Sequence, residues 1–294
     1  MTRPISTEDA DPRYDGIETW DTAALAEALL STQRAAAEAA EAAAPNLARA
    51  INAAAERLAR GGRLIYLGAG TSGRLAVLDA AELKPTFDWP PPRAVALMAG
   101  GEGALIHAVE GAEDDTAAAP QALDALQVGP HDVAIAVAAS GRTPYTLAGL
   151  RHAQARGALA IAVTNVPGSP LATQAEIALI AATGAEIIAG STRMKAGTAQ
   201  KILLNCLSTG IMVRLGHVWR GRMVDMRPTN AKLRARAERM VTELTGATAA
   251  QAAAALAEGG TTKCAVAMLL LGVDAGTARA RLDAAGGILA RVLD

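Results

Sequence analysis

The sequence predicts an α/β fold with a doubly wound, mainly parallel five-stranded sheet, N-terminal helices and a small C-terminal helical bundle. Short apolar runs that stop at glycine or polar residues alternate with helical stretches, which is typical of βαβ units. Two Ala-rich helical stretches precede the first of these runs. Beyond residue 228 the apolar runs disappear, and glycines separate short helical segments.

The N-terminal region is expected to begin with an irregular polar arm over residues 1–20. Asp21 can cap a long Ala-rich helix, which Pro45 is expected to interrupt. A second helix is expected over about residues 46–60, before two consecutive glycines. The segment 1–60 is therefore predicted to be an arm and helices that pack on the core.

The strands and helices of the α/β domain follow, and this domain is assigned to residues 61–228. The predicted strands cover residues 63–67, 94–98, 133–137, 159–163 and 177–180. The predicted helices lie near 71–82, 103–127 (broken), 143–156 and 191–215. Residues 229–294 form the predicted helical bundle. Ligands of such sheets bind beyond the carboxyl ends of the strands, so functional residues are expected there.

The composition argues against nucleic-acid and membrane partners. The formal net charge is −1, and no run of about 18 uncharged apolar residues occurs. The polar first residues lack the apolar stretch of a signal peptide. Cys206 and Cys264 both fall inside predicted helices, where two reduced, partly buried thiols are expected. These features predict a cytoplasmic protein.

The histidines and cysteines give no sign of a metal site. The four histidines are scattered, and neither cysteine has a metal-ligand spacing with another Cys or His. We therefore expect no metal site.

The first strand runs into Gly68-Ala-Gly-Thr-Ser-Gly73. The glycine spacing formally matches a dinucleotide fingerprint, but the tip of the second strand, Met98-Ala-Gly100, carries no acid. A Walker loop is excluded because no Gly-Lys-Ser/Thr follows. Thr71 and Ser72 instead place hydroxyl groups at a helix N-terminus, where backbone N–H groups and the helix dipole favour an anion.

The third strand ends in a similar loop, which contains Ser140, Arg142, Thr143 and Pro144. Proline suits the first turn of a helix. Two hydroxyl-bearing loops at neighbouring strand ends can converge on one compact anion, and a monophosphate is the natural candidate. The alternative is that each loop merely caps its own helix.

A third segment of this kind is Gly190-Ser-Thr-Arg-Met-Lys-Ala-Gly-Thr198. Ser191 can cap the helix that follows, with Arg193 and Lys195 in its first turn. Cations are unfavourable at a helix N-terminus, and an anionic ligand would offset that cost. The segment can also be a solvated basic turn, so the phosphate-binding interpretation of Ser191 and Lys195 stays open at this point.

Carboxylates are the remaining candidates for proton transfer, since no metal spacing or reactive Cys–His set is present. Asp79-Ala-Ala-Glu82 closes the helix after the first loop, and an acidic run, Glu110-Gly-Ala-Glu-Asp-Asp115, follows the second strand. Most acidic residues are solvated or cap helices, as expected here of Asp114 and Asp115.

Together these segments resemble the N-acetylmuramic acid 6-phosphate etherases. The resemblance is dense over roughly residues 60–235 and looser in the helical tail, and its longest segment is Gly190–Lys201. Further matching segments are 67–75, 79–82, 99–102, 108–115, 138–145, 164–169, 184–186, 223–225 and 229–230. Two departures stand out. The family's Arg-Asn-Pro element has no clear counterpart in residues 1–20, and its Asp-Ala-Ser-Glu reads Asp-Ala-Ala-Glu here.

The resemblance implies a homodimer with a sugar isomerase-type domain that works without metal or cofactor. The implied reaction cleaves the lactyl ether of N-acetylmuramic acid 6-phosphate to N-acetylglucosamine 6-phosphate and D-lactate, by elimination of lactate and addition of water, in cell-wall recycling. Glu82 matches the family's proton donor, and burial near Leu78 and Leu83 is expected to raise its pKa. Glu113 matches the second catalytic glutamate, for which we expect the role of base.

Two other functions stay open. A sugar-phosphate aldose–ketose isomerase would use the same fold and phosphate loops. A non-catalytic sugar-phosphate-binding regulator, similar to the glucokinase regulatory proteins, is the second alternative. Apolar helical stretches at 21–60 and 191–215 offer more apolar surface than one sheet can cover, which also predicts a symmetric dimer.

Overall fold

The computed structural model describes residues 7–227 and 230–293. The chain divides into two compact units, Met1–Ala81 with Pro92–Ser208 and Glu82–Pro91 with Thr209–Asp294, and each is described by itself. The predicted three-part division, with boundaries after residues 60 and 228, stays a prediction. Residues 1–6 of the expected arm and Thr229 of the matching segments lie outside the described residues.

The first unit is built on a five-stranded parallel sheet in the order β2-β1-β3-β4-β5, which confirms the prediction. Its strands are β1 (Leu64–Gly68), β2 (Ala94–Met98), β3 (Val133–Val137), β4 (Leu159–Thr164) and β5 (Ile177–Ile180). The strand order reverses at β1, since β2 lies on one side of it and β3 to β5 on the other. In this topology a crevice opens beyond the carboxyl ends of β1 and β3.

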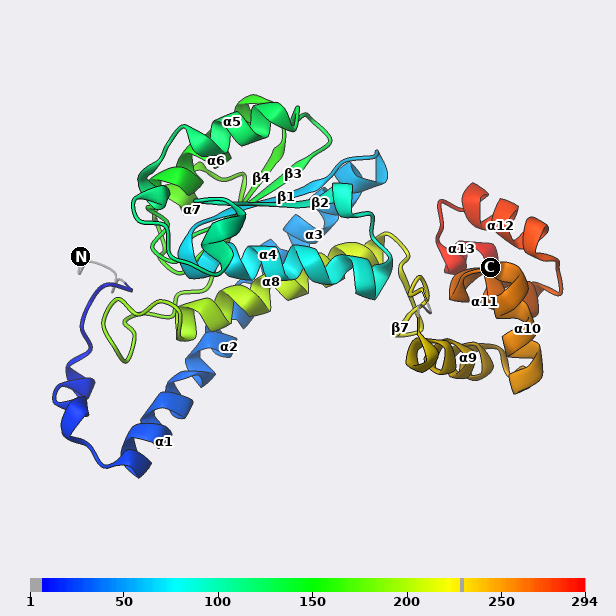
Figure 1. Ribbon diagram of the computed structural model, residues 1–294, viewed down its shortest axis with the longest axis horizontal. Helices are drawn as coiled ribbons and strands as arrows, with labels where there is room; N and C mark the ends of the chain where they lie inside the picture. The colour runs from blue at the N-terminus through cyan, green and yellow to red at the C-terminus, as the bar shows by residue number, and fades with distance from the viewer. Residues whose placement is uncertain (1–6, 228–229, 294) are drawn as a thin grey trace. The chain divides into compact units, whose positions relative to one another are not determined.

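Helices cover both faces of this sheet (Figure 1). One face carries α5 (Ala118–Ala125), α6 (Pro144–Ala155) and α7 (Pro170–Gln174), and the other carries α3 (Ala44–Ala59), α4 (Gly70–Phe87) and α8 (Lys195–Arg214). The core under α5 to α7 consists largely of Ala, Val, Leu and Ile, with Tyr145 its single aromatic member among the buried residues described. Small side chains thus allow close packing of helices on the sheet.

The N-terminal helices differ from the prediction in where they break. The Asp21 Oδ1 atom accepts hydrogen bonds from the N–H groups of Ala23 and Ala24, at 2.9 and 3.0 Å, and caps α1 (Thr22–Thr32) as expected. The prediction of a single long helix is wrong, because α1 ends at Thr32 and a separate helix, α2 (Arg34–Glu41), follows. Pro45 lies in the first turn of α3 and does not separate two helices, since the missing N–H costs nothing there.

The helix after β5 also begins later than expected, at Lys195. Ser191 does not cap it. The carboxylate of Glu186, which is 1% exposed, accepts hydrogen bonds from the N–H groups of Lys195 and Ala196 at 3.2 and 2.8 Å. A buried carboxylate is a stronger acceptor than a hydroxyl and also complements the helix dipole. Of the broken helix expected over residues 103–127, only α5 is an α-helix, and the preceding part forms the 3₁₀ turns η4 (Glu102–Leu105) and η5 (Ala112–Asp114).

The second unit contains the predicted helical bundle. Its helices are α9 (Ala231–Thr245), α10 (Ala249–Gly259), α11 (Thr262–Leu271), α12 (Ala275–Ala284) and α13 (Leu289–Leu293). A small hairpin of β6 (Val218–Trp219) and β7 (Arg222–Met223) precedes them. It was not predicted, because strands of two residues give no signal in the sequence. The Lys263 Nζ atom donates to Asp225 Oδ2 at 2.6 Å and to the Gly287 carbonyl at 2.8 Å, which ties the end of the hairpin to the bundle.

The described residues also bear on the expectations for membrane spans and for the two cysteines. No single helix there is long and apolar enough to span a membrane, although α10 and α11 reach that length and composition together across a bend of 118°. Both cysteines are free. Cys264 is buried as expected, but Cys206 is exposed, because it lies on the outer side of α8.

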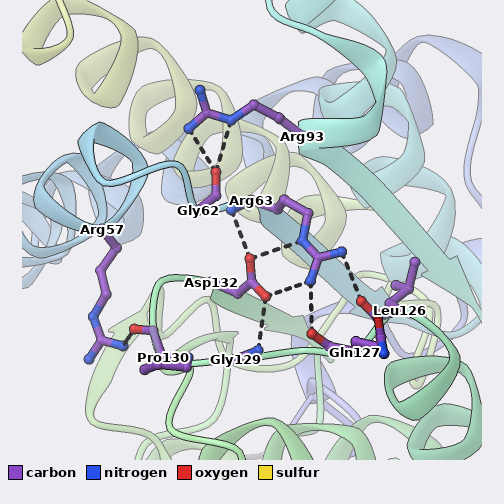
Figure 2. Close-up of polar contacts among 9 residues, drawn as sticks. All are labelled: Arg57, Gly62, Arg63, Arg93, Leu126, Gln127, Gly129, Pro130 and Asp132. Carbon is purple, nitrogen blue, oxygen red and sulfur yellow. Dashed lines mark hydrogen bonds and ion pairs between the residues drawn. The ribbon is translucent and has the colours of Figure 1, made fainter.

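A buried ion pair closes the end of the sheet opposite the crevice (Figure 2). The Asp132 carboxylate accepts hydrogen bonds from the backbone N–H, Nε and Nη2 of Arg63 at 2.9, 3.0 and 2.7 Å, and from the Gly129 N–H at 3.0 Å. Burial opposes ionisation, but the Arg63 side chain, these backbone donors and the Arg63 charge outweigh it. The pKa of Asp132 is therefore lowered.

Replacing Asp132 by asparagine should destabilise the fold at neutral pH by about 2 kcal/mol, the size of hydrogen bonds to a charged group. Because the folded-state pKa is lowered, this contribution is present above the unfolded-state value near 4 and is lost as the pH falls through the folded value. Urea unfolding of both proteins should show a difference at pH 7 that shrinks at pH 3. Asp15→Asn, at an exposed position, is the control, and a difference that does not change with pH would contradict this account.

Candidate active site

The two predicted hydroxyl loops meet at the crevice beyond β1 and β3. They line a cavity of about 380 Å³ to which Thr71, Ser72, Ser140, Arg142 and Thr143 all contribute. α4 begins at Gly70 and α6 at Pro144, so both loops direct a helix N-terminus towards this end of the sheet. Hydroxyl groups, backbone N–H groups and one guanidinium thus surround a single space, as an anion such as a phosphate group requires.

Close backbone approach makes this arrangement possible. A Cβ atom on Gly73 would lie 2.8 Å from the Gly68 carbonyl oxygen, so glycine allows α4 to pack directly against the end of β1. Gly141 has φ +63°, and a Cβ atom there would lie 2.2 Å from Ser169 Oγ. Glycine is required at both positions, for space at the first and for space and backbone conformation at the second.

The two serines of the cavity differ in whether their hydroxyl groups already donate a hydrogen bond within the protein. Ser72 donates to Gln200 Oε1 at 2.9 Å, and Gln200 Nε2 in turn donates to Asn165 Oδ1 at 3.0 Å. The Asn165 amide donates to two backbone carbonyl groups, which fixes the orientation of the whole chain of amides. Ser140 Oγ accepts from the Arg142 N–H at 3.2 Å, which leaves its own proton for a ligand. Ser140 is therefore the better placed donor to an anion.

Glu113 also lines this cavity, together with Asp114. It lies in η5, which follows the loop after β2, and its side chain is exposed. Asp114 is exposed, as expected of a surface residue, and it also lies in the lining of this cavity. Asp115 does cap, since its Oδ1 atom accepts from the N–H groups of Ala117 and Ala118 at 2.8 and 3.1 Å. The acidic run thus divides between structure and cavity.

A second cavity of about 380 Å³ adjoins the first and shares Ala69, Gly70 and Glu113 with it. Its lining is more apolar, and Arg74 and Glu110 are its other charged residues. Glu113 therefore faces both spaces. Within the described ranges, no group of three or more His, Cys, Asp or Glu side chains could hold a metal ion.

Three predicted site residues do not line either cavity. Ser191 and Lys195 precede and begin α8, but only their neighbour Thr192 reaches the first cavity. Lys195 is buried. Arg13 lowers the pKa of Asp11 in the N-terminal arm against the opposing effect of burial, and the charge of Lys195 adds a smaller lowering. The roles of Ser191 and Lys195 in phosphate binding stay predictions.

Glu82 is the third of these residues, and its expected burial is wrong for the single chain. Glu82 is exposed, and Leu78 is 47% exposed, while Leu83 is buried. Leu78 and Glu82 are one helical turn apart and share a face of α4. Asp79, about 100° round the helix from Leu78, is buried and accepts from Tyr66 Oη at 2.8 Å, Asn205 Nδ2 at 2.7 Å and Ser208 Oγ at 3.0 Å. These bonds fix which face of α4 is turned outward.

Two charged residues of the cavities were not singled out from the sequence. Glu8 of the N-terminal arm lines the first cavity, and its neighbour Thr7 is fully buried. Arg74 lines the second cavity from α4. Arg74 lies inside a segment that carries the resemblance, which was a usable signal. The sequence around Glu8 has no such signal, because local sequence does not show that an irregular arm lies beside a loop that is distant in the chain.

Comparisons with known proteins agree with this geometry. Residues 46–154 match the family described as the glucokinase regulatory protein N-terminal SIS domain, and residues 115–209 match the SIS domain family. An N-acetylmuramic acid 6-phosphate etherase from Deinococcus radiodurans is 55% identical over 294 residues, 100% of this chain and 96% of that protein. The chain belongs to the N-acetylmuramic acid 6-phosphate etherase family. An etherase from Serratia proteamaculans is 46% identical, over 98% of each chain.

The fold of this etherase family member also occurs in a more distant solved structure. A proposed phosphosugar isomerase involved in capsule formation from Bacteroides fragilis is 21% identical, with a TM-score of 0.50 over 67% of this chain and 94% of that one. This likeness shows the shared sugar isomerase (SIS) fold. The helical unit after α8 belongs to the part of the etherase chain that the match over the SIS domain does not include.

Replacing Ser140 by alanine should weaken phosphate binding by about 1–2 kcal/mol, the loss of one hydrogen bond to a charged group. This corresponds to roughly a 5- to 30-fold higher dissociation constant. Titration calorimetry with inorganic phosphate measures it directly. Ser31→Ala, at an exposed position on α1, is the matched control. Unchanged phosphate affinity in Ser140→Ala would show that phosphate does not bind in this cavity.

Proposed function

We propose that this chain cleaves the lactyl ether of N-acetylmuramic acid 6-phosphate with water, giving N-acetylglucosamine 6-phosphate and D-lactate. The observation that carries the proposal is the identity to etherases over the whole chain, together with Glu113 beside the hydroxyl-lined cavity. The reaction is assigned to the cytoplasm and to the recycling of cell-wall amino sugars. Two free thiols are consistent with a reducing compartment.

The chemistry needs one base, one acid and a held phosphate. The C2 proton of the open-chain sugar lies next to the aldehyde carbon, so a carboxylate base can remove it. The C3–O bond then breaks with its electron pair, and an acid protonates the departing ether oxygen to give lactate. Water adds to the resulting double bond, with its oxygen at C3 and a proton at C2. Two carboxyl groups in different environments can supply these steps.

Glu113 is assigned as the base and Glu82 as the acid. Glu113 lines the cavity that holds the phosphate in this proposal, so it can reach the sugar of a substrate bound to its own chain. Ser140, Thr143 and Arg142 would fix the phosphate, which positions C2 against the base.

Glu82 is too far along α4 to serve that same cavity. Twelve residues separate it from Gly70, and at 1.5 Å per residue this is roughly 18 Å along the helix. The ether carbon of the sugar lies only a few covalent bonds from its phosphate. We therefore assign Glu82 to the site of a second copy in a homodimer, where the exposed face of α4 with Leu78 would be covered.

An assay of D-lactate release from N-acetylmuramic acid 6-phosphate by the purified protein tests the proposed function. Release of lactate, with N-acetylglucosamine 6-phosphate in equal amount, is the expected result. Conversion of fructose 6-phosphate without lactate release would favour the aldose–ketose isomerase. Binding of sugar phosphates without any turnover would favour the regulator.

A further inference from the structure

The second cavity differs from the first in a way that matches the remainder of the substrate. The first cavity has hydroxyl groups and Arg142, and its lining also includes Glu8, Glu113 and Asp114. The second is lined mainly by small and apolar side chains, and Arg74 is the one cation among its lining residues in the described chain. The substrate of the proposed function has two anionic groups, the phosphate and the carboxylate of the lactyl ether. One cavity with a guanidinium is thus available for each anion.

The hydrogen bonds of Arg74 leave one edge of its guanidinium group available. Nε donates to the Leu105 carbonyl at 3.0 Å, and Nη2 donates to the Ala104 carbonyl at 2.7 Å. These two bonds use the side edge of the planar group and fix its orientation. The end edge, formed by one N–H of each terminal nitrogen, matches a carboxylate in bidentate fashion. No carboxylate of the described residues pairs with Arg74 within 4 Å.

We propose that Arg74 binds the carboxylate of the lactyl group and thereby determines the specificity of the enzyme for the lactyl ether. This inference rests on the proposed function. Glu113 borders both cavities, so a ligand with its phosphate beside Ser140 and its carboxylate beside Arg74 has its C2–C3 bond next to Glu113. The methyl group of the lactyl moiety meets the apolar lining, which includes Met98, Ala104 and Val109.

The charges that line the second cavity indicate that a carboxylate can bind there only if Arg74 is present. Glu110 and Glu113 also line it, so an entering carboxylate meets two like charges. Without a cation this arrangement would repel lactyl substrates. The product N-acetylglucosamine 6-phosphate has no carboxylate and makes no use of Arg74. The residue therefore separates substrate from product, a distinction that the phosphate cavity cannot make.

Two reactions of the same enzyme separate this role from structural support. Lactate release needs the lactyl carboxylate. Exchange of the C2 proton of N-acetylglucosamine 6-phosphate with deuterated water, which needs only the proton removal that begins the reverse of hydration, does not need it. Arg74→Gln should lower kcat/KM for lactate release about 10- to 100-fold, the usual effect of losing a bidentate charged pair, and should leave the exchange rate within about 2-fold. Arg74→Lys should recover part of the loss, because it retains the charge but not the fork.

A modified substrate provides the second test. The lactamide analogue of the substrate replaces the carboxylate by a neutral amide. Wild-type enzyme should lose about as much activity on this analogue as Arg74→Gln loses on the natural substrate, and the variant should show little further loss on the analogue. Arg49→Gln, an exposed α3 residue outside both cavities, is the matched control and should retain full activity.

Equal losses of lactate release and C2 exchange in Arg74→Gln would overturn the proposal, because the side chain would then only support the 104–105 segment. Full lactate release by Arg74→Gln would overturn it as well. A wild-type protein that releases no lactate would instead refute the proposed function, whatever the variant does. The two failures are therefore distinguishable.

Discussion

Replacing Glu82 by glutamine should reduce D-lactate release by at least about 100-fold, the usual size of a general acid contribution. The lactyl ether oxygen is a poor leaving group, so elimination nearly stops when no acid protonates it. Binding of inorganic phosphate should stay the same, because Glu82 does not line the phosphate cavity. The C2 proton of N-acetylmuramic acid 6-phosphate should still exchange with deuterated water, since the base is intact.

Steady-state kinetics and proton NMR measure the two activities of Glu82→Gln on one sample. Glu102→Ala is a suitable control, since Glu102 is an exposed carboxylate in η4 that lines neither cavity. Near-normal lactate release by Glu82→Gln would mean that another group donates the proton.

The second large effect is expected for Glu113→Gln, which should lose both lactate release and C2 exchange by at least about 100-fold. Removal of the C2 proton precedes every later step, so the loss of the base stops exchange as well as elimination. Deuterium incorporation from solvent, followed by NMR, separates this variant from Glu82→Gln. Loss of elimination with normal C2 exchange in Glu113→Gln would show that the roles of the two glutamates are reversed.

The sheet could be predicted because buried parallel strands have a strong local signal. Each predicted strand is a short apolar run that ends at or shortly before a glycine or polar residue, and all five join one parallel sheet as expected. Helix starts were less predictable where the capping group is distant in sequence. Glu186 caps α8 from nine residues before Lys195, whereas Ser191 was the local candidate. The hairpin of β6 and β7 is too short to show any periodicity.

The phosphate loops could be predicted for a topological reason. Parallel strands end at one edge of the sheet, so Thr71 and Ser140 had to lie near each other. The position of Glu82 could not be derived in this way. Sequence periodicity shows that a residue lies on an apolar helix face, but not whether that face meets the core or a second copy. Leu78 made a core position plausible, yet the buried contacts of Asp79 turn the side of α4 that carries Asp79 and Leu83 inward and leave Leu78 and Glu82 exposed.

Mixing of two inactive variants tests whether Glu82 of one copy and Glu113 of another form each active site. Glu82→Gln and Glu113→Gln are mixed in equal amounts, dissociated and reassociated, and D-lactate release is measured. Half of the random dimers then contain one copy of each variant, and one of their two sites has both glutamates. Recovery of about a quarter of wild-type activity is therefore expected if each site is shared. Activity no higher than that of the separate variants, in a mixture shown to exchange subunits, would contradict it.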